Sequence, residues 1–195
     1  PVGGVASRVA LAGIELAFYL GKVLLPVGLS PIYPRWEINP PRAWQFLPWV
    51  ALVAAAAWAW RARATWGRHA ILAIGFFVIM ILPVLGFVTI AYMRITWAAD
   101  HFLYLPMISL VAAAAAAATV WHDSLPAGSR GPATAAGLAV IVALAVAAAR
   151  YSAVWVDERT LWTHTLTRNP DAWQAHNRLG GVLLSAGETD AAHEH

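Results

Sequence analysis

The sequence of 195 residues contains no cysteine and has few charged residues. Without cysteine it has neither a disulfide nor a thiolate metal site. Lysine is scarce too, since Lys22 is the single lysine and the other basic residues are arginines. Charged residues make up 12% and hydrophobic residues 60% of the chain, whereas a soluble domain carries about 25% charged residues. The composition excludes an ordinary soluble domain and predicts an integral membrane protein.

Long apolar stretches predict an all-α fold with a polytopic bundle of about five spans, since about 20 helical residues cross the hydrocarbon core. The predicted spans are residues 8–26, 43–61, 69–91, 102–121 and 132–150. By the positive-inside rule, the arginine-rich loop 61–69 is cytoplasmic. Loops 27–42 and 92–101, and everything after residue 150, are then expected on the extracytoplasmic side.

After residue 150 the composition becomes that of soluble helices. We expect a membrane domain over residues 1–150, an amphipathic connecting helix over 151–170 and a further helical piece over 171–195. Asn169-Pro170 should end the connecting helix, because a residue before proline is pushed out of the helical region.

Residues 171–195 resemble the first part of a tetratricopeptide repeat (TPR), which has small residues where its helices touch and a glycine at the turn. Its packing positions fall at Leu179, Gly180, Leu183, Gly187 and Ala192. A repeat cannot bury its apolar face alone, so we expect a solenoid of further repeats to follow. An ordinary helical hairpin is the alternative.

Three charged residues, Arg8, Glu15 and Lys22, are seven residues apart and so lie on one stripe of the first predicted span. Ionisable residues within a span usually face a cavity, so Glu15 and Lys22 are candidates for binding a charged lipid. Alternatively, the helix lies partly in the interface, or Lys22 reaches the headgroups while Glu15 pairs with another helix.

The stretch RITWAADHFLYLP, residues 94–106, concentrates polar side chains at the start of the fourth predicted span. Arg94 and His101 can bind a phosphate, and Asp100 can orient one of them or pair with Arg94. Tyr104 follows His101 by three residues and would share its helix face. Alternatively, Asp100 caps the helix while Arg94 and Tyr104 anchor it in the interface.

Other chemistry has little support in the sequence. The seven histidines fall in different segments, so we predict no metal site and no cofactor, while a divalent metal stays open. The arginines are scattered, which argues against nucleic acid as a partner. No nucleophile elbow, phosphate loop or dinucleotide motif is present.

Three stretches, in this order, resemble a family of membrane enzymes. ADHFLYLP at 99–106 is similar to the family segment A-(D/E)-R-(Y/F)-x-Y-L-P, and YLGKVLLPVGLSPIYP at 19–34 is similar to YL-x-LL-x-P-x-x-L-x-x-x-Y. A third run, with Trp155, Trp162 and Asn169-Pro170, leads into the repeat. The family comprises the transmembrane, TPR-containing O-mannosyltransferases and their bacterial relatives, which join a multi-span glycosyltransferase-like domain of the C superfamily to a repeat tail.

The resemblance implies transfer of a sugar from a polyprenyl-phosphate donor to an acceptor on the extracytoplasmic side, for bacteria at the inner membrane. Arg94, Asp100, His101 and Tyr104 would border the donor phosphate, and the repeats would bind a protein acceptor or partner. His101 stands where the family usually has arginine.

The family's catalytic acidic residue lies in an N-terminal half that we expect to precede this fragment, so we assign no catalytic residue. A non-enzymatic, membrane-anchored TPR scaffold for envelope assembly is the alternative.

Overall fold

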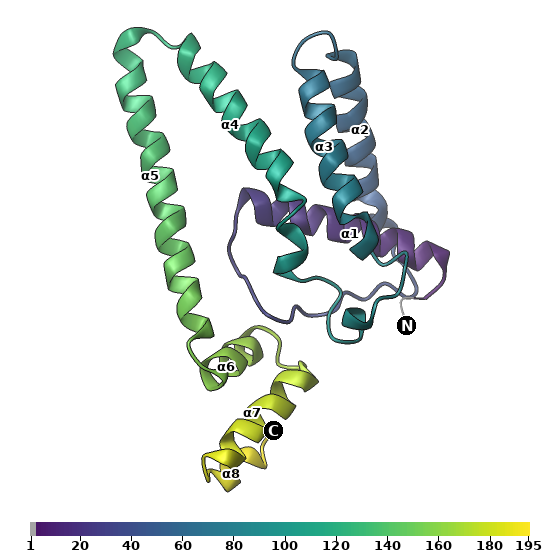
Figure 1. The fold of residues 1–195 in the computed structure, drawn as a ribbon. Coiled ribbons are helices and arrows are strands. Elements are labelled where there is room, and N and C mark those ends of the chain that lie inside the picture. The colour runs from purple at the N-terminus through teal and green to yellow at the C-terminus, as the bar shows by residue number, and fades with distance from the viewer. Residues whose placement is uncertain (1–2) are drawn as a thin grey trace. The chain divides into compact units, whose positions relative to one another are not determined.

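The computed structural model describes residues 3–195, which form helices and connecting loops without a strand (Figure 1). The chain divides into two compact units, Pro1–Ala113 and Ala114–His195. The α-helices are α1 (Val5–Leu24), α2 (Leu47–Arg61), α3 (Gly67–Ile81), α4 (Met107–Ser124), α5 (Ala127–Ser152), α6 (Glu158–Arg168), α7 (Trp173–Ser185) and α8 (Thr189–Ala192). The 3-10 helices are η1 (Ala43–Phe46), η2 (Leu82–Val84), η3 (Ala91–Arg94), η4 (Asp100–Leu103) and η5 (Ala153–Trp155).

Three helical stretches of the described chain are long and apolar enough to cross a membrane. They are Ala43–Arg61, Gly67–Val84 and Ala127–Trp155. These stretches match three of the five predicted spans. The other two predictions fall on α1, which carries three charged side chains, and on α4, which ends in the polar sequence His-Asp-Ser. The structure therefore supports a helical membrane protein with three candidate spans.

In the first unit, α1 lies across one end of the α2–α3 pair (Figure 1). The indole Nε1 of Trp49 on α2 donates a hydrogen bond to the carbonyl oxygen of Val9 on α1 at 2.8 Å. A Cβ atom at Gly13 would lie 2.8 Å from the same indole nitrogen, closer than real Cβ contacts. Glycine at this position therefore allows the tryptophan of α2 to reach the backbone of α1.

The core of the first unit joins α1 and α3 to two long loops. We call residues 25–42 and 85–106 the loop layer. The larger apolar cluster consists of Ala12, Leu16, Tyr19, Tyr33, Phe77, Ile81, Leu85, Ala98 and Leu103. Burying each large apolar side chain contributes about 1.5–3 kcal/mol, so the loop layer is held by the same packing that holds the helices.

The second unit begins within α4 and contains α5 to α8, whereas the sequence suggested a boundary at residue 150. No residue of α5 is buried within the described chain, although this helix is long and apolar. An apolar helix without a polar face is typical of a segment surrounded by lipid.

The helix α6 is bounded by residues with clear local roles. Asp157 caps it, because its Oδ1 accepts a hydrogen bond from the backbone N–H of Thr160 at 2.7 Å. This hydrogen bond holds the pKa of the Asp157 carboxyl below its usual value. The helix ends at Arg168, directly before Asn169-Pro170, as predicted.

The predicted repeat positions lie on α7, α8 and the turn between them. Leu179, Gly180 and Leu183 are buried on α7, and Gly187 has a φ of 79° in the turn, a backbone conformation that favours glycine. Ala192 ends α8, which is four residues long. The described residues thus hold one full helix and the start of a second, and a solenoid stays a prediction.

Candidate functional site

Two of the stretches that carry the family resemblance meet in the first unit. Tyr19 on α1 is fully buried, and its hydroxyl accepts a hydrogen bond from the N–H of Ala99 at 3.1 Å and donates to the Ala99 carbonyl oxygen at 3.4 Å. The hydroxyl of Thr96 donates to the carbonyl oxygen of Tyr33 at 3.0 Å. These contacts hold the start of η4 against α1 and the preceding loop.

Asp100 lies at the centre of this contact. The hydroxyl of Tyr33 donates a hydrogen bond to Asp100 Oδ1 at 2.6 Å and accepts one from the N–H of Ser30 at 3.2 Å. Burial raises the pKa of Asp100, and the Tyr33 hydrogen bond and the charge of Lys22 partly oppose that rise. Asp100 does not cap the fourth helix, because α4 begins at Met107. The capping interpretation is therefore wrong.

Lys22 lies under the same loop. Its Nζ donates to the carbonyl oxygen of Gly28 at 3.2 Å and lies 5.2 Å from the ring centroids of both Phe18 and Tyr33. A second carbonyl oxygen, that of Val27, accepts from the same Nζ at 2.5 Å, and a lysine held by two carbonyl oxygens and two ring faces keeps its positive charge near Asp100. Lys22, Tyr33 and Asp100 thus form a polar cluster, which we call the Asp100 cluster.

Glu15, predicted to accompany Lys22, lies apart from this cluster. Its side chain is fully buried, and neither carboxylate oxygen has a hydrogen-bond partner within residues 3–195. It also forms no ion pair in that range, so the expected pairing with another helix is not found. Glu15 is therefore a buried carboxyl without a partner in the described chain.

His101 and Tyr104 point to different surroundings, although they are three residues apart. The exposed His101 ring packs edge-on against Tyr92 and Phe102, with centroid distances of 5.2 and 4.5 Å. Tyr104 is 67% exposed, and its hydroxyl has no polar contact among the described residues. His101 therefore borders the Asp100 cluster, whereas the Tyr104 side chain lies on the protein surface away from it.

Arg94 lies in a separate pocket of about 660 Å³ in the first unit. The lining residues are Gly3, Arg8, Arg35, Thr89, Met93, Arg94 and Trp97. We call this the arginine pocket. Arg94 forms no ion pair within residues 3–195, so its predicted pairing with Asp100 is wrong.

Arg8 is fixed in this pocket by neutral acceptors. Its Nη1 donates to the carbonyl oxygens of Gly86 and Phe87, each at 2.9 Å, and its Nη2 donates to Thr89 Oγ1 at 3.4 Å. The turn that presents these carbonyls requires Gly86, which has a φ of 79° and leaves no room for a Cβ beside Leu11. The guanidinium is thus held in place without losing its charge.

Arg35 is held in the same way. Its Nη2 donates to the carbonyl oxygen of Met93 at 3.2 Å and to that of Arg94. Its guanidinium carbon lies 5.3 Å from the centroid of the Trp97 ring, a cation–π geometry. Carbonyl oxygens and a ring face carry no net charge, so they leave the positive charge of the pocket uncompensated.

The structure therefore brings together Lys22 and Asp100, with His101 at the border, and separates Arg94, Glu15 and Tyr104 from them. Sequence reasoning missed Arg35 and the pocket role of Arg8. A signal was present, because Arg35 and Arg94 are arginines on the side that the positive-inside rule predicts to be poor in them.

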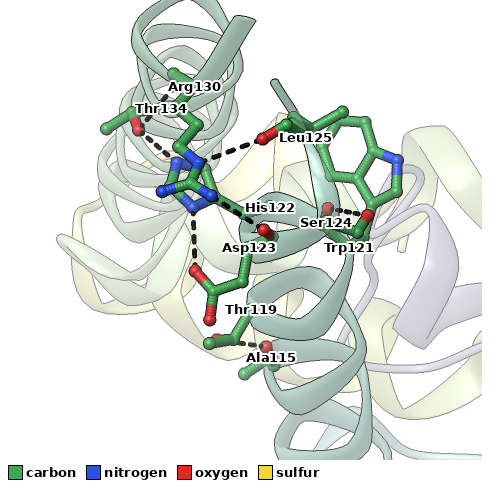
Figure 2. A network of polar contacts seen from close by, with 9 residues as sticks. All are labelled: Ala115, Thr119, Trp121, His122, Asp123, Ser124, Leu125, Arg130 and Thr134. Atoms are coloured by element: carbon green, nitrogen blue, oxygen red, sulfur yellow. Dashed lines mark hydrogen bonds and ion pairs between the residues drawn. The ribbon is translucent and has the colours of Figure 1, made fainter. Parts of the chain in front are cut away.

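A second polar network joins α4 to α5 in the second unit (Figure 2). The guanidinium of Arg130 donates to the carbonyl oxygens of Asp123 at 2.9 Å and Leu125 at 3.1 Å, and His122 Nε2 lies 3.1 Å from Thr134 Oγ1. The last carbonyls of a helix lack partners within the helix and attract positive charge. This network therefore caps α4 and closes the turn.

The described chain contains no group of three or more histidine, aspartate or glutamate side chains placed to hold a metal ion. Fold and site together define an all-helical protein with three candidate spans and a polar loop layer. No protein-family model, curated protein or solved structure matches the chain.

Proposed function

We propose that this chain is the C-terminal membrane part of a glycosyltransferase that uses a polyprenyl-phosphate sugar as donor. In this proposal the loop layer faces the extracytoplasmic side, and the TPR-like segment binds the protein acceptor or a partner there. The loop layer borders the donor, and the catalytic acidic residue lies in a part of the protein that precedes these residues.

One observation carries the proposal. The stretches 19–34 and 99–106, chosen from the sequence for their likeness to this enzyme family, contact each other through Tyr19 with Ala99 and through Tyr33 with Asp100. Two unrelated loops of a simple anchor have no reason to share buried hydrogen bonds between their polar residues, since such groups are costly to bury unless paired.

The chemistry of the site fits a sugar phosphate. A carboxylate such as Asp100 accepts hydrogen bonds from sugar hydroxyls, and an exposed imidazole such as His101 donates one to a phosphate oxygen when the ring nitrogen carries a proton. Tyr33 and Lys22 act as positioning residues, because they hold Asp100 by a hydrogen bond and by charge. None of these groups is assigned as the base.

The proposal is tested by sugar transfer in membranes that contain the full-length protein. Membranes receive a radiolabelled polyprenyl-phosphate sugar, and the label that reaches protein is measured for wild type, Asp100→Asn and His101→Ala at matched expression. Glu158→Gln, which replaces an exposed carboxyl on the connecting helix α6, is the matched control. We expect Asp100→Asn and His101→Ala each to lower transfer by about tenfold or more, as loss of a charge-assisted hydrogen bond does.

Unchanged transfer in both site variants would contradict the proposed role of the loop layer in the reaction. An absence of transfer from every donor tried with the wild type would favour the membrane-anchored scaffold instead. Loss of transfer in the control as well would show that the assay reports expression or folding rather than the site.

A further inference from the structure

The arginine pocket collects positive charge that nothing in the described chain neutralises. Three guanidinium groups line it, and within residues 3–195 none of them forms an ion pair. Arg8 is half-buried, whereas Arg35 and Arg94 are exposed, so the pocket opens to solvent and offers its positive charge to an anion.

Much of the hydrogen-bonding capacity of the pocket is also unused. A guanidinium has five N–H donors. The contacts of Arg8 and Arg35 within the described chain leave donors of both groups unpaired, and the Arg94 side chain forms no polar contact there. Arginine offers these donors as a planar fork, the geometry that matches the oxygens of phosphate and carboxylate groups.

Trp97 supplies an independent sign of a missing acceptor. Its side chain lines the pocket and is 7% exposed, and its Nε1 has no hydrogen-bond partner in the described chain. A buried indole N–H is a donor without any acceptor function, and leaving it unpaired is costly. The nitrogen has almost no accessible surface, so a small shift of the ring toward a ligand oxygen in the pocket would satisfy it.

From this combination we propose that the arginine pocket is a binding site for a phosphomonoester dianion. The N–H donors of three guanidinium groups and one indole outnumber the hydrogen bonds that the two oxygens of one carboxylate can accept. The three terminal oxygens of a phosphomonoester can accept more of these hydrogen bonds. The volume of about 660 Å³ leaves room for more of the ligand than its phosphate.

The phosphate can come from a lipid headgroup or from a soluble phosphate. Polyprenyl monophosphate is the lipid form, and its choice rests on the proposed function. When a sugar passes from a polyprenyl-phosphate donor to an acceptor hydroxyl, the acceptor oxygen forms a bond to the anomeric carbon and gives up its proton to a base. The bond between the anomeric carbon and the phosphate oxygen breaks. The electron pair stays on that oxygen, so a phosphodiester monoanion becomes a phosphomonoester that carries up to two negative charges. The pocket would then bind the released lipid phosphate, apart from the Asp100 cluster that borders the donor.

The test measures binding to the purified full-length protein in nanodiscs of neutral lipid. The probes are polyprenyl monophosphate, uncharged polyprenol and inorganic phosphate. The variants are Arg35→Gln and Arg94→Gln, of which the second removes a side chain without polar contacts and so leaves folding intact. Arg63→Gln is the matched control, because Arg63 also donates to a carbonyl oxygen, at 2.9 Å, and lies 5.1 Å from a tryptophan ring centroid.

We expect polyprenyl monophosphate to bind more tightly than polyprenol, and each pocket variant to weaken that binding by about tenfold or more while Arg63→Gln leaves it unchanged. Parallel weakening of inorganic phosphate binding would identify the phosphate group alone as sufficient, and binding of the lipid form alone would identify the lipid as the source. Equal affinity for polyprenol, or equal weakening by the control variant, would overturn the proposal. Phosphate binding without any sugar transfer would support the phosphate site and contradict the proposed glycosyltransferase activity.

Discussion

The hydroxyl of Tyr19 gives a sharp prediction, because it accepts the hydrogen bond of the Ala99 N–H and shares the Ala99 carbonyl oxygen with the N–H of Phe102, so its removal leaves the Ala99 N–H unpaired. Ala99 is 1% exposed, so neither group has access to water once the hydroxyl is removed. Tyr19→Phe keeps the ring in the core and removes the two hydrogen bonds at 3.1 and 3.4 Å. Leaving a buried backbone group unpaired costs about 1–3 kcal/mol, and we take about 2 kcal/mol for this change.

At about 2–4 °C per kcal/mol for a chain of about 150–250 residues, about 2 kcal/mol lowers the melting temperature by about 4–8 °C. The assay is thermal melting of the purified full-length protein in detergent, followed by tryptophan fluorescence. Tyr104→Phe is the matched control, since the hydroxyl of Tyr104 has no polar contact in the described chain and the variant should melt as the wild type does. Equal melting temperatures for Tyr19→Phe and the wild type would refute the reasoning that this hydroxyl holds η4 against α1.

Three further predictions follow from single residues. Gly67→Ala should lower the melting temperature, since its Cβ would lie 2.0 Å from a backbone oxygen of α2, whereas Gly75→Ala on the same helix has no atom within 4 Å and should be neutral. Glu15→Met should raise the melting temperature because it removes a buried carboxyl without a partner, and a fall would mean that Glu15 has one beyond residues 3–195. Burial raises the pKa of Asp100, so the folded state binds its proton more tightly and the free energy of unfolding should fall as the pH rises above about 3.9. Asp100→Asn should flatten that dependence in melts across pH, and an unchanged slope would contradict it.

Composition and periodicity were enough to predict the helical class and several helix ends. The second predicted span, residues 43–61, matches a candidate span residue for residue, and α6 ends where Asn169-Pro170 requires. Both predictions rest on local chemistry, since the length of an apolar run and the sterics of proline depend on neighbouring residues alone.

The first and fourth spans show where the sequence was insufficient. Hydropathy assigned residues 8–26 to the membrane, but α1 lies across the end of α2–α3 and buries residues on several of its faces. The fourth helix was expected from residue 102 and begins at Met107, because the preceding residues form η4. The charges of α1 and the polar end of α4 are visible in the sequence, whereas the packing of α1 across α2–α3 and the short η4 depend on tertiary contacts.

The candidate site was predicted in part for the same reason. Asp100 and Lys22 were identified from their charge and position, and they do lie in one cluster. The neighbours of Arg94 could not be predicted from the sequence. Arg35 contacts the Arg94 carbonyl oxygen at a sequence separation of 59 residues, and Arg8 contacts Gly86 at a separation of 78. Contacts at such separations are fixed by the fold.

The proposed function requires the loop layer to lie on the extracytoplasmic side and the turn between α2 and α3 on the cytoplasmic side. The chain has no cysteine, so single cysteines placed at Val88 in the loop layer and at Ala64 in the turn, both exposed, report on these two sides without interference from this segment. Intact cells that express the full-length protein, with any cysteines outside this segment replaced by serine, are treated with a membrane-impermeant maleimide before and after permeabilisation. We predict that Val88→Cys is labelled in intact cells and Ala64→Cys only after permeabilisation. The reverse pattern, or labelling of both positions from one side, would contradict the account.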